Sequence, residues 1–347
     1  MAAKKSLKKL LQETEIKQNF PNNEWYSIRS LLGNTWAFFY ILIGGREAGK
    51  SYAVMDYFVW EWKKRKKPFI WLRLTEASVR KMLSNDASQL VDADIARRYD
   101  LDLTVKGNQV FDHDEPMARV LALSTFYNDK GVALFDNEFF LGYNIALDEM
   151  NREKNEKKTF DINYAFVNQM ENLIRSTKEK LRIFLIGNTL EEASDIMCSF
   201  NFIPENFGRY YVRKKKAIID YIPPSKKYSD RRKGTVADLL APQASTFTNK
   251  IMVDVSLIDK SRLKKPSYIV RFSKDEAYTV WDSKIVAPYN KERLNTEILM
   301  YAYLDGIFNT DLRDAVLHTF HNRGYMFKNL ITQKRFKKAL ELMKPKG

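Results

Sequence analysis

The sequence has little of what disulfide-stabilised, zinc-dependent or membrane proteins need. It holds one cysteine, Cys198, which excludes internal disulfides and is typical of a reducing cytoplasm. The three histidines, His113, His318 and His321, are scattered and have no cysteine partner at metal-ligand spacing, so catalytic zinc is not expected. No apolar run approaches the length of a bilayer span, and the first twenty residues lack the apolar region and cleavage site of a secretory signal. No membrane association is expected.

The most specific motif of the chain is a glycine-rich loop. An apolar segment at 38–43 precedes it and a helix-compatible run at 52–62 follows, as a phosphate-binding loop requires. The loop has the pattern G-x-x-x-x-G-K-S and consists of Gly44, Gly45, Arg46, Glu47, Ala48, Gly49, Lys50 and Ser51.

Each kind of residue in this loop suits a nucleoside triphosphate with Mg²⁺. Gly44 and Gly49 permit backbone conformations that direct N–H groups at phosphate oxygens. Lys50 adds a positive charge near the β and γ phosphates, and the Ser51 hydroxyl is a Mg²⁺ ligand. The alternative is a glycine-rich turn between strand and helix that binds nothing.

Two later strand ends carry the polar groups that hydrolysis needs. The apolar segment at 144–147 ends in Asp148 and Glu149, which predicts one carboxylate near the Mg²⁺ and one beside the attacking water. The apolar segment at 181–187 ends in Asn188, whose amide suits a γ-phosphate sensor. An asparagine at this position is equally well explained as the cap of a turn or helix.

The order of segments predicts an α/β fold with a mainly parallel sheet in the first part of the chain. Strands are expected at 68–74, 118–124, 143–148 and 181–187, helices at 76–90 and 162–175, and a hairpin at 101–111. The expected domains are a P-loop ATPase domain at 1–205, a basic linker at 206–248 and a smaller α+β domain at 249–347. In the last domain, β-like runs are expected at 250–258, 267–273 and 276–282, and helices at 291–308 and 332–343.

The net charge of +15 is concentrated in two stretches. The stretch 209–233 contains ten basic and two acidic residues, a net charge of +8. The stretch 323–347 contains eight basic residues and one acidic residue, a net charge of +7. Either stretch alone can be a solvated face. Together with a nucleotide site, they favour a polyanionic partner, most simply the phosphates of a nucleic acid.

In this order the motifs resemble the DNA packaging ATPases of small podoviruses, the phi29-like phages. The resemblance lies in the loop with arginine at its third position, the strand at 69–73, the hairpin at 105–107, the Asp148–Glu149 pair with a lysine-rich loop after it, the helix end at 174–175 and Asn188. It covers most of the first 205 residues and is looser afterwards.

The resemblance implies an ASCE-type P-loop motor related to the FtsK/HerA translocases. Such a motor is a homo-oligomeric ring, a pentamer by this resemblance, which sits on the portal of a procapsid in the cytoplasm of the infected bacterium and pumps double-stranded DNA with ATP. It leaves open whether a structural RNA joins the motor.

The resemblance also implies roles for individual residues. Asp148 supports the metal, Glu149 is the catalytic carboxylate and Arg46 senses the γ-phosphate. Arg175 is the finger given to the neighbouring subunit's nucleotide, and Lys130 is a second basic residue at that interface.

A basic loop follows the Asp148–Glu149 pair. Its counterpart in the family faces the pore of the ring, which implies contact with DNA phosphates. The alternative is a solvated surface turn. The residues concerned are Arg152, Lys154, Lys157 and Lys158.

The resemblance implies a C-terminal domain with a degenerate RNase H-type nuclease fold. Asp254, Asp282 and Asp305 lie on or after expected strands, but their spacing does not indicate a metal cluster, so no nuclease activity is expected.

Two other functions compete with the motor. One is a cytoplasmic NTP-dependent switch or kinase whose basic stretches are ordinary surface. The other is a DNA-binding scaffold whose phosphate loop is accidental. The concentration of charge in two stretches favours the motor over the kinase.

Overall fold

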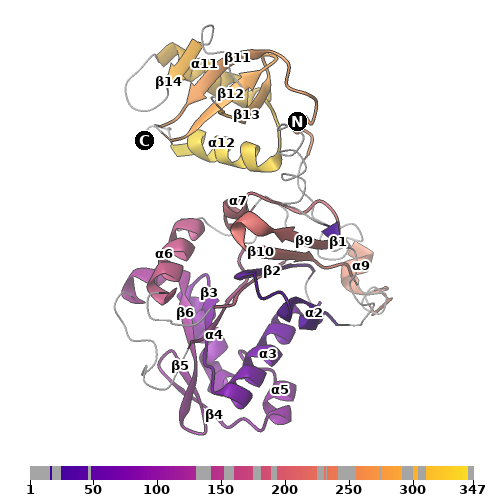
Figure 1. The fold of residues 1–347 in the computed structure, drawn as a ribbon, viewed down its shortest axis with the longest axis vertical. Helices are drawn as coiled ribbons and strands as arrows, with labels where there is room; N and C mark the ends of the chain where they lie inside the picture. Colours follow the sequence, from indigo (N-terminus) through magenta and orange to yellow (C-terminus); the bar gives the residue numbers. More distant parts are fainter. Residues whose placement is uncertain are drawn as a thin grey trace. The chain divides into compact units, whose positions relative to one another are not determined.

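The structure of the protein is a computed structural model (Figure 1). It describes residues 16–17, 25–45, 48–129, 142–151, 160–174, 181–188, 194–224, 230–231, 233–240, 255–273, 275–290, 300–303 and 310–342. The chain divides into two compact units, Met1–Met252 and Val253–Gly347. In the described ranges, no helix combines the length and the apolar character that crossing a bilayer requires.

The first unit is built on a ten-stranded sheet with the order β1-β9-β10-β2-β8-β7-β3-β6-β5-β4. The six strands from β10 to β6 are parallel, and antiparallel strands extend the sheet at both ends. This confirms the predicted α/β fold with its mainly parallel sheet. The strands are β1 (Ile16–Lys17), β2 (Phe39–Ile43), β3 (Phe69–Arg73), β4 (Leu103–Lys106), β5 (Gln109–Asp112), β6 (Glu115–Ala122), β7 (Asn144–Asp148), β8 (Ile183–Gly187), β9 (Gly208–Val212) and β10 (Ala217–Tyr221).

Helices cover both faces of this sheet (Figure 1). Successive side chains of a strand point to opposite faces, so Tyr40 and Leu42 of β2 pack with α3, whereas Ile41 and Ile43 pack with α6. The helical segments are α2 (Arg29–Leu32), α3 (Lys50–Arg65), α4 (Glu76–Ala87), α5 (Ala93–Arg98), η1 (Leu123–Asp129), α6 (Ile162–Ile174), α7 (Asp195–Phe200), η2 (Arg213–Lys215) and α9 (Val236–Leu240).

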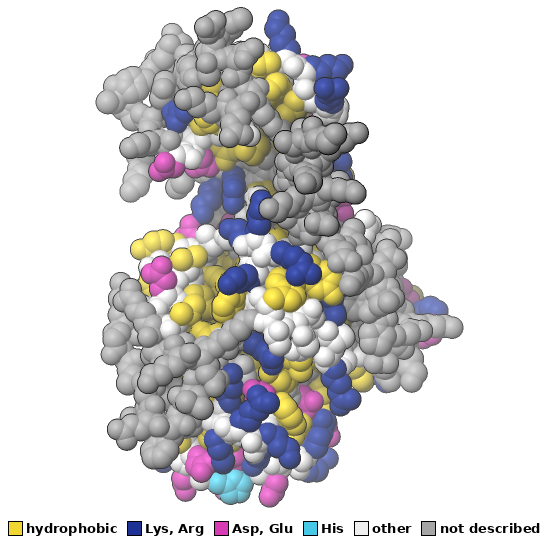
Figure 2. Space-filling view, viewed as in Figure 1, with side chains coloured by type: hydrophobic (Ala, Val, Ile, Leu, Met, Phe, Trp, Pro, Cys, Tyr) yellow, Lys and Arg dark blue, Asp and Glu magenta, His cyan; other side chains and the backbone are white. Residues whose placement is uncertain are grey.

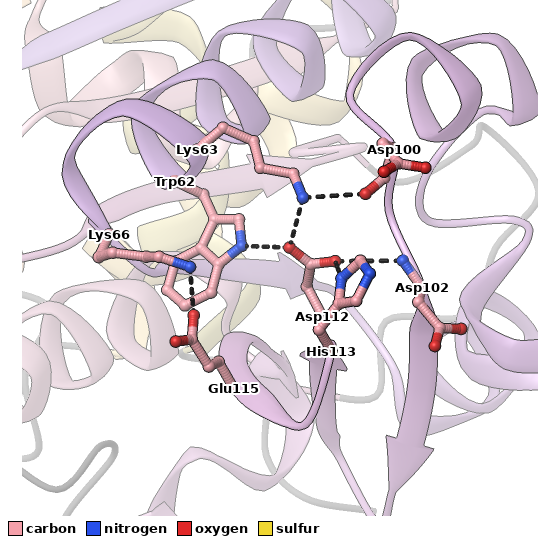
Figure 3. Close-up of polar contacts among 8 residues, drawn as sticks. All are labelled: Trp62, Lys63, Lys66, Asp100, Asp102, Asp112, His113 and Glu115. Carbon is pink, nitrogen blue, oxygen red and sulfur yellow. Dashed lines mark hydrogen bonds and ion pairs between the residues drawn. The ribbon is translucent and has the colours of Figure 1, made fainter.

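A buried carboxylate fixes the far end of α3 to the β4–β5 hairpin (Figure 3). Asp112 is 1% exposed, and its oxygens accept hydrogen bonds from Trp62 Nε1 at 2.8 Å and from the backbone N–H of Asp102 at 3.1 Å. Lys63 Nζ and His113 Nδ1 each lie 2.9 Å from the same carboxylate. Burial opposes the charge, but the hydrogen bonds outweigh it and lower the pKa of Asp112.

The second unit is a five-stranded mixed sheet with the order β14-β11-β12-β13-β15. Phe336 is fully buried, and its ring lies 5.2 to 5.7 Å from the rings of Phe272, Tyr278, Tyr325 and Phe327. The elements are β11 (Pro266–Arg271), β12 (Ala277–Trp281), β13 (Ile285–Pro288), β14 (Met300–Tyr303), α11 (Thr310–His321), β15 (Met326–Phe327) and α12 (Leu330–Leu342). The antiparallel β11–β12 pair and the helix α12 confirm two predictions.

Two predicted segments were wrong. The linker expected at 206–248 contains β9 and β10, and β10 is buried between β2 and β9 as part of the large sheet. Its basic residues at 213–216 are exposed in the turn between the two strands, which is why the stretch looked like a connector. The helix expected at 291–308 is a strand at 300–303, because this segment pairs in parallel with β11. The rest of that segment lies outside the described residues.

Candidate functional site

The described residues of the phosphate loop lie between β2 and α3, and Arg46 and Glu47 of the loop lie outside the described residues. Gly49 has a φ of +83°, in the left-handed region that favours glycine, and Lys50 begins the helix. The backbone N–H of Gly44 donates to the carbonyl oxygen of Gly187 at 3.3 Å, and the carbonyl oxygen of Ala48 accepts from the N–H of Tyr26 at 3.0 Å. Both ends of the loop are therefore held by other segments.

Lys50 is folded back onto its own loop. Its Nζ donates to the carbonyl oxygens of Gly44 at 2.9 Å and Gly45 at 2.6 Å, and the residue is 6% exposed. Burial lowers the pKa of Lys50 to about 8, although Asp148 opposes the shift. This positive charge is available to an anion that takes the place of the two carbonyl groups.

The residues expected to hold Mg²⁺ are brought together. Ser51 Oγ donates to Asp148 Oδ1 at 3.0 Å, across the gap between α3 and β7. A hydroxyl and a carboxylate are hard oxygen ligands of the kind that Mg²⁺ prefers. Among the described residues, no three His, Cys, Asp or Glu side chains form a complete metal cage. A Mg²⁺ ion that takes its other ligands from phosphates and water fits this pair.

Arg73 binds both carboxylates at the end of β7. Its Nη1 donates to Asp148 Oδ2 at 2.9 Å and its Nη2 donates to Glu149 Oε2. The Glu149 side chain is 55% exposed, and its backbone φ is +56°. No role for Arg73 was predicted from the sequence. The available signal was that it is the only charged residue of the strand Phe69–Arg73 and stands at its carboxyl end.

The carboxyl ends of the central strands enclose a pocket of about 420 Å³. Asn188, directly after β8, lines it, and its carbonyl oxygen accepts from Asn151 Nδ2 at 3.3 Å. A Cβ atom at Gly187 would lie 2.7 Å from Met150 Cε, so a side chain there would displace the end of Met150. The pocket is lined by Ala48, Gly49, Lys50, Ser51, Tyr52, Asp148, Glu149, Ile186, Gly187 and Asn188.

The structure thus brings together Lys50, Ser51, Asp148, Glu149 and Asn188, which were selected from separate parts of the sequence. Other predicted site residues lie outside the described residues, and their roles stay predictions. These are Arg46, Glu47, Lys130, Arg152, Lys154, Lys157, Lys158 and Arg175.

A second, larger cavity of about 1140 Å³ runs along α3 from the phosphate loop. It shares Gly49 and Tyr52 with the phosphate pocket and extends to Trp60. Aromatic side chains line much of it, and its charged lining residues are Arg29, Asp56 and Asp92.

The chain is similar in sequence to proteins that package viral DNA. The model of the family described as podovirus DNA encapsidation protein (Gp16) matches residues 22–291. The DNA packaging protein of Bacillus phage phi29 is 27% identical over 234 residues, and the match covers 66% of each chain. The DNA packaging protein of Bacillus phage B103 is 24% identical over 234 residues, 66% of this chain and 68% of that protein. The chain therefore spans about two thirds of these relatives.

Solved structures share the fold. A chain of the bacteriophage phi29 genome packaging motor assembly superposes with a TM-score of 0.63 at 20% identity, over 93% of this chain and all of that one. The gp11 DNA packaging motor described for Phi-28 has a TM-score of 0.62 at 14% identity, over 94% of this chain and 99% of that one. Since the family model covers most of the sequence, the chain belongs to the podovirus DNA encapsidation protein (Gp16) family, a family of viral DNA packaging proteins.

Proposed function

We propose that this protein is the ATP-driven motor that moves double-stranded viral DNA into a procapsid. The observation that carries the proposal is the meeting of Lys50, Ser51, Asp148 and Glu149 in one pocket, in a chain of a DNA encapsidation family. The names of the related proteins describe packaging proteins and a packaging motor assembly, which supports the same role here.

ATP binding is assigned to the phosphate loop and the start of α3. Lys50 turns from the carbonyl groups of Gly44 and Gly45 to the phosphates, while backbone N–H groups at the helix start hold the same anion. Ser51 and Asp148 hold Mg²⁺, which when bound neutralises charge on the phosphate oxygens.

Hydrolysis is assigned to Glu149. Its carboxylate orients the attacking water and accepts a proton as the water oxygen bonds to the γ-phosphorus. The bond from that phosphorus to the β–γ bridging oxygen breaks, and ADP leaves with the electron pair. Arg73 keeps the Glu149 side chain at the pocket edge, and Asn188 donates to the γ-phosphate or the water from the end of β8.

The transition state needs more positive charge than the described pocket supplies. Among the described lining residues, Lys50 is the only cation. Arg73 contacts two of the lining residues, but its charge is engaged by their carboxylates. We therefore assign further cations to Arg46 in the loop and, from a neighbouring subunit, to Arg175 and Lys130. This assignment makes the active motor a homo-oligomeric ring, with a pentamer as the expected size.

DNA contact is assigned to Arg152, Lys154, Lys157 and Lys158, which follow the catalytic strand in the sequence. The ring is placed on the portal of the procapsid, in the cytoplasm of the infected host, and no nuclease step is proposed. In the second unit, the β11–β12–β13 meander with β14 parallel to β11 supports an RNase H-type fold. Asp282 Oδ1 and Oδ2 accept from the backbone N–H groups of Lys265 at 3.1 Å and Lys264 at 3.3 Å, so this carboxylate stabilises a turn.

The test is the ATP hydrolysis rate with and without double-stranded DNA. A motor is stimulated by DNA of any sequence, a switch or kinase is indifferent to DNA, and a scaffold does not hydrolyse ATP. Stimulation that disappears when Lys154, Lys157 and Lys158 are replaced by Gln supports the assigned DNA contact. A chain that hydrolyses ATP at the same rate with and without DNA is not this motor.

A further inference from the structure

A buried ion pair joins β9 to β10 in the first unit. Arg209 Nε donates to Asp220 Oδ1 at 2.7 Å, and Arg209 Nη2 donates to Asp220 Oδ2 at 2.8 Å. Asp220 is 0% exposed and Arg209 is 8% exposed. Figure 2 shows Lys and Arg side chains spread over the visible surface of the protein, and Arg209 differs from these because it is buried. At least one basic residue of the stretch 209–233 therefore serves the interior of the fold.

The same carboxylate also binds a tyrosine from the segment before the phosphate loop. Tyr26 Oη donates to Asp220 Oδ2 at 2.6 Å. Burial of the hydroxyl and the neighbouring carboxylate raise the pKa of Tyr26, so the hydroxyl keeps its proton and stays a donor. Arg209 adds a second tie, because its Nη2 donates to Ser30 Oγ at 2.8 Å and its Nη1 donates to the Ser30 carbonyl oxygen at 3.2 Å. Both ends of the segment 26–30 are thus fixed to the β9–β10 pair.

Tyr26 in turn holds the phosphate loop through its backbone. Its N–H donates to the carbonyl oxygen of Ala48 at 3.0 Å, directly before the left-handed Gly49. A Cβ atom at Gly49 would lie 3.4 Å from Trp25 Cε3 and 3.6 Å from the Tyr26 nitrogen, so residues 25 and 26 lie close against the loop. Lys50 follows Gly49 directly, so the position of this glycine sets where the phosphate-binding helix begins.

The ion pair suits placement better than it suits stability. Loss of hydration offsets most of the attraction between two buried charges, and an apolar pair of similar volume often stabilises a core as well or better. β10 is buried throughout, and Asp220 is its only charged residue. A carboxylate there can do what an apolar residue cannot, which is to accept a directed hydrogen bond from Tyr26. The parallel register places Asp220 beside Leu42 of β2, two residues before the loop begins at Gly44.

We propose that Asp220 is a positioning residue of the nucleotide site. It holds Tyr26, whose backbone N–H holds the Ala48 carbonyl group, and so keeps the phosphate loop in its binding conformation before ATP arrives. Neither Tyr26 nor Asp220 lines the phosphate pocket, so their effect on the phosphates passes through the loop backbone. The inference rests on the proposed ATP-binding function and names what prepares the loop for it.

Tyr26→Phe tests the proposal with the least disturbance, because it removes one hydroxyl and leaves Asp220 paired with Arg209. A loop that is prepared a third to a tenth of the time should raise the dissociation constant of Mg·ATP by about threefold to tenfold. The matched control is Tyr40→Phe, which removes a tyrosine hydroxyl that donates to the Asn34 carbonyl oxygen at 3.0 Å in the same unit. It should leave the dissociation constant unchanged. Equal constants for wild type and Tyr26→Phe, or equal increases in both variants, would overturn the proposal.

Turnover at saturating ATP separates positioning from catalysis and from general damage. Bound phosphates restore the loop and Glu149 is untouched, so Tyr26→Phe should match the wild-type single-turnover rate once ATP is saturating. A merely structural role would lower the fraction of folded protein and leave the dissociation constant of the folded chain as it was. A lower rate at saturation with an unchanged dissociation constant would contradict positioning.

A double-mutant cycle tests whether Asp220 acts through Tyr26. Asp220→Asn keeps the size of the side chain and weakens it as an acceptor, so it should also raise the dissociation constant of Mg·ATP. In the Tyr26→Phe background the same change should add nothing, because the hydrogen bond is already absent. Additive effects would show that Asp220 influences ATP binding by another route. If Asp220→Asn does not fold, the comparison of Tyr26→Phe with Tyr40→Phe decides alone.

Amide hydrogen exchange without nucleotide separates this inference from the proposed function. Exchange in a peptide spanning residues 44–51 should be faster in Tyr26→Phe than in wild type, and unchanged in Tyr40→Phe. If wild type binds no ATP but this difference in exchange is seen, the ATPase assignment is rejected and the positioning stands. If wild type binds ATP and Tyr26→Phe matches it in both exchange and affinity, the positioning is rejected and the ATPase assignment stands.

Discussion

The two sheets of this protein differ in what stands at the ends of their strands. In the first unit the parallel strands β2, β3, β7 and β8 end at the same edge, where they place the phosphate loop, Arg73, Asp148 and Asn188 around one pocket. In the second unit β11, β12 and β13 run antiparallel, and Asp282 after β12 accepts backbone hydrogen bonds. Parallel strands gather polar residues at one edge, whereas a meander sends them to both ends.

Glu149→Gln should slow ATP hydrolysis in the first unit without weakening ATP binding. The amide keeps the shape of the side chain but cannot accept the proton of the attacking water, so ATP turnover should fall by about 10² to 10⁴. Mg·ATP affinity should persist, because Lys50, Ser51 and Asp148 are untouched. Single-turnover kinetics and equilibrium binding measure the two effects, and near-normal turnover would remove Glu149 from its role. Lys50→Ala is the contrasting variant and should lose affinity.

Phe336→Ala should destabilise the second unit and leave the first unit folded and able to bind ATP. Its ring fills the centre of an aromatic cluster, so its removal should cost about 3 to 5 kcal/mol of unfolding free energy. Calorimetry should show one transition shifted to lower temperature while ATP binding is unchanged. A loss of ATP binding in this variant would show that the second unit supports the nucleotide site.

Asp112→Ala tests a buried carboxylate of the first unit outside the pocket. It removes the acceptor of the Trp62 Nε1 hydrogen bond and the carboxylate partner of Lys63, whose Nζ keeps its bond to the Asp100 carbonyl oxygen, which should cost about 2 to 3 kcal/mol. The matched control is Glu115→Gln, which removes the exposed ion pair with Lys66 shown in the same close-up (Figure 3) and should change stability by less than ~1 kcal/mol. Chemical denaturation measures the unfolding free energy of each variant. Equal losses in the two variants would show that the buried carboxylate stabilises the fold no more than the exposed ion pair does.

The low pKa of Lys50 predicts opposite pH effects on binding and on stability. Between pH 8 and 10 the folded chain loses the Lys50 proton while the unfolded chain keeps it, so the contribution of this residue to stability rises with pH. Phosphate needs the charged amine, so the dissociation constant of ATP should increase by up to ~10-fold per pH unit above 8. Titration calorimetry of wild type and Lys50→Arg measures this. The arginine variant should give a nearly flat profile, and a flat profile in the wild type would contradict the shift.

The sequence was sufficient for the parts of the first unit that depend on local pattern. The apolar strands, the phosphate loop and the Asp148–Glu149 pair are continuous segments, and parallel strands bring their carboxyl ends together. The role of Arg73 depends on β3 lying beside β7, a long-range pairing that no local pattern reports. For the same reason β9 and β10 were taken for a linker, since their exposed turn at 213–216 carries the charge that marks a connector.

The second unit was predicted less completely because its strands are short and pair at a distance. The β11–β12 hairpin is local and was found, whereas β14 pairs with β11 across about thirty residues and was taken for a helix. Apolar runs of this length are compatible with either structure until the pairing is known.

We propose that ATP hydrolysis at the pocket of the first unit drives DNA into a capsid. The most direct measurement is protection of viral DNA from DNase by purified procapsids supplied with this protein and ATP. We predict protection of genome-length DNA with wild type, and none with Glu149→Gln even though that variant binds ATP. Protection by the Glu149→Gln variant, or protection that does not need ATP, would contradict the account.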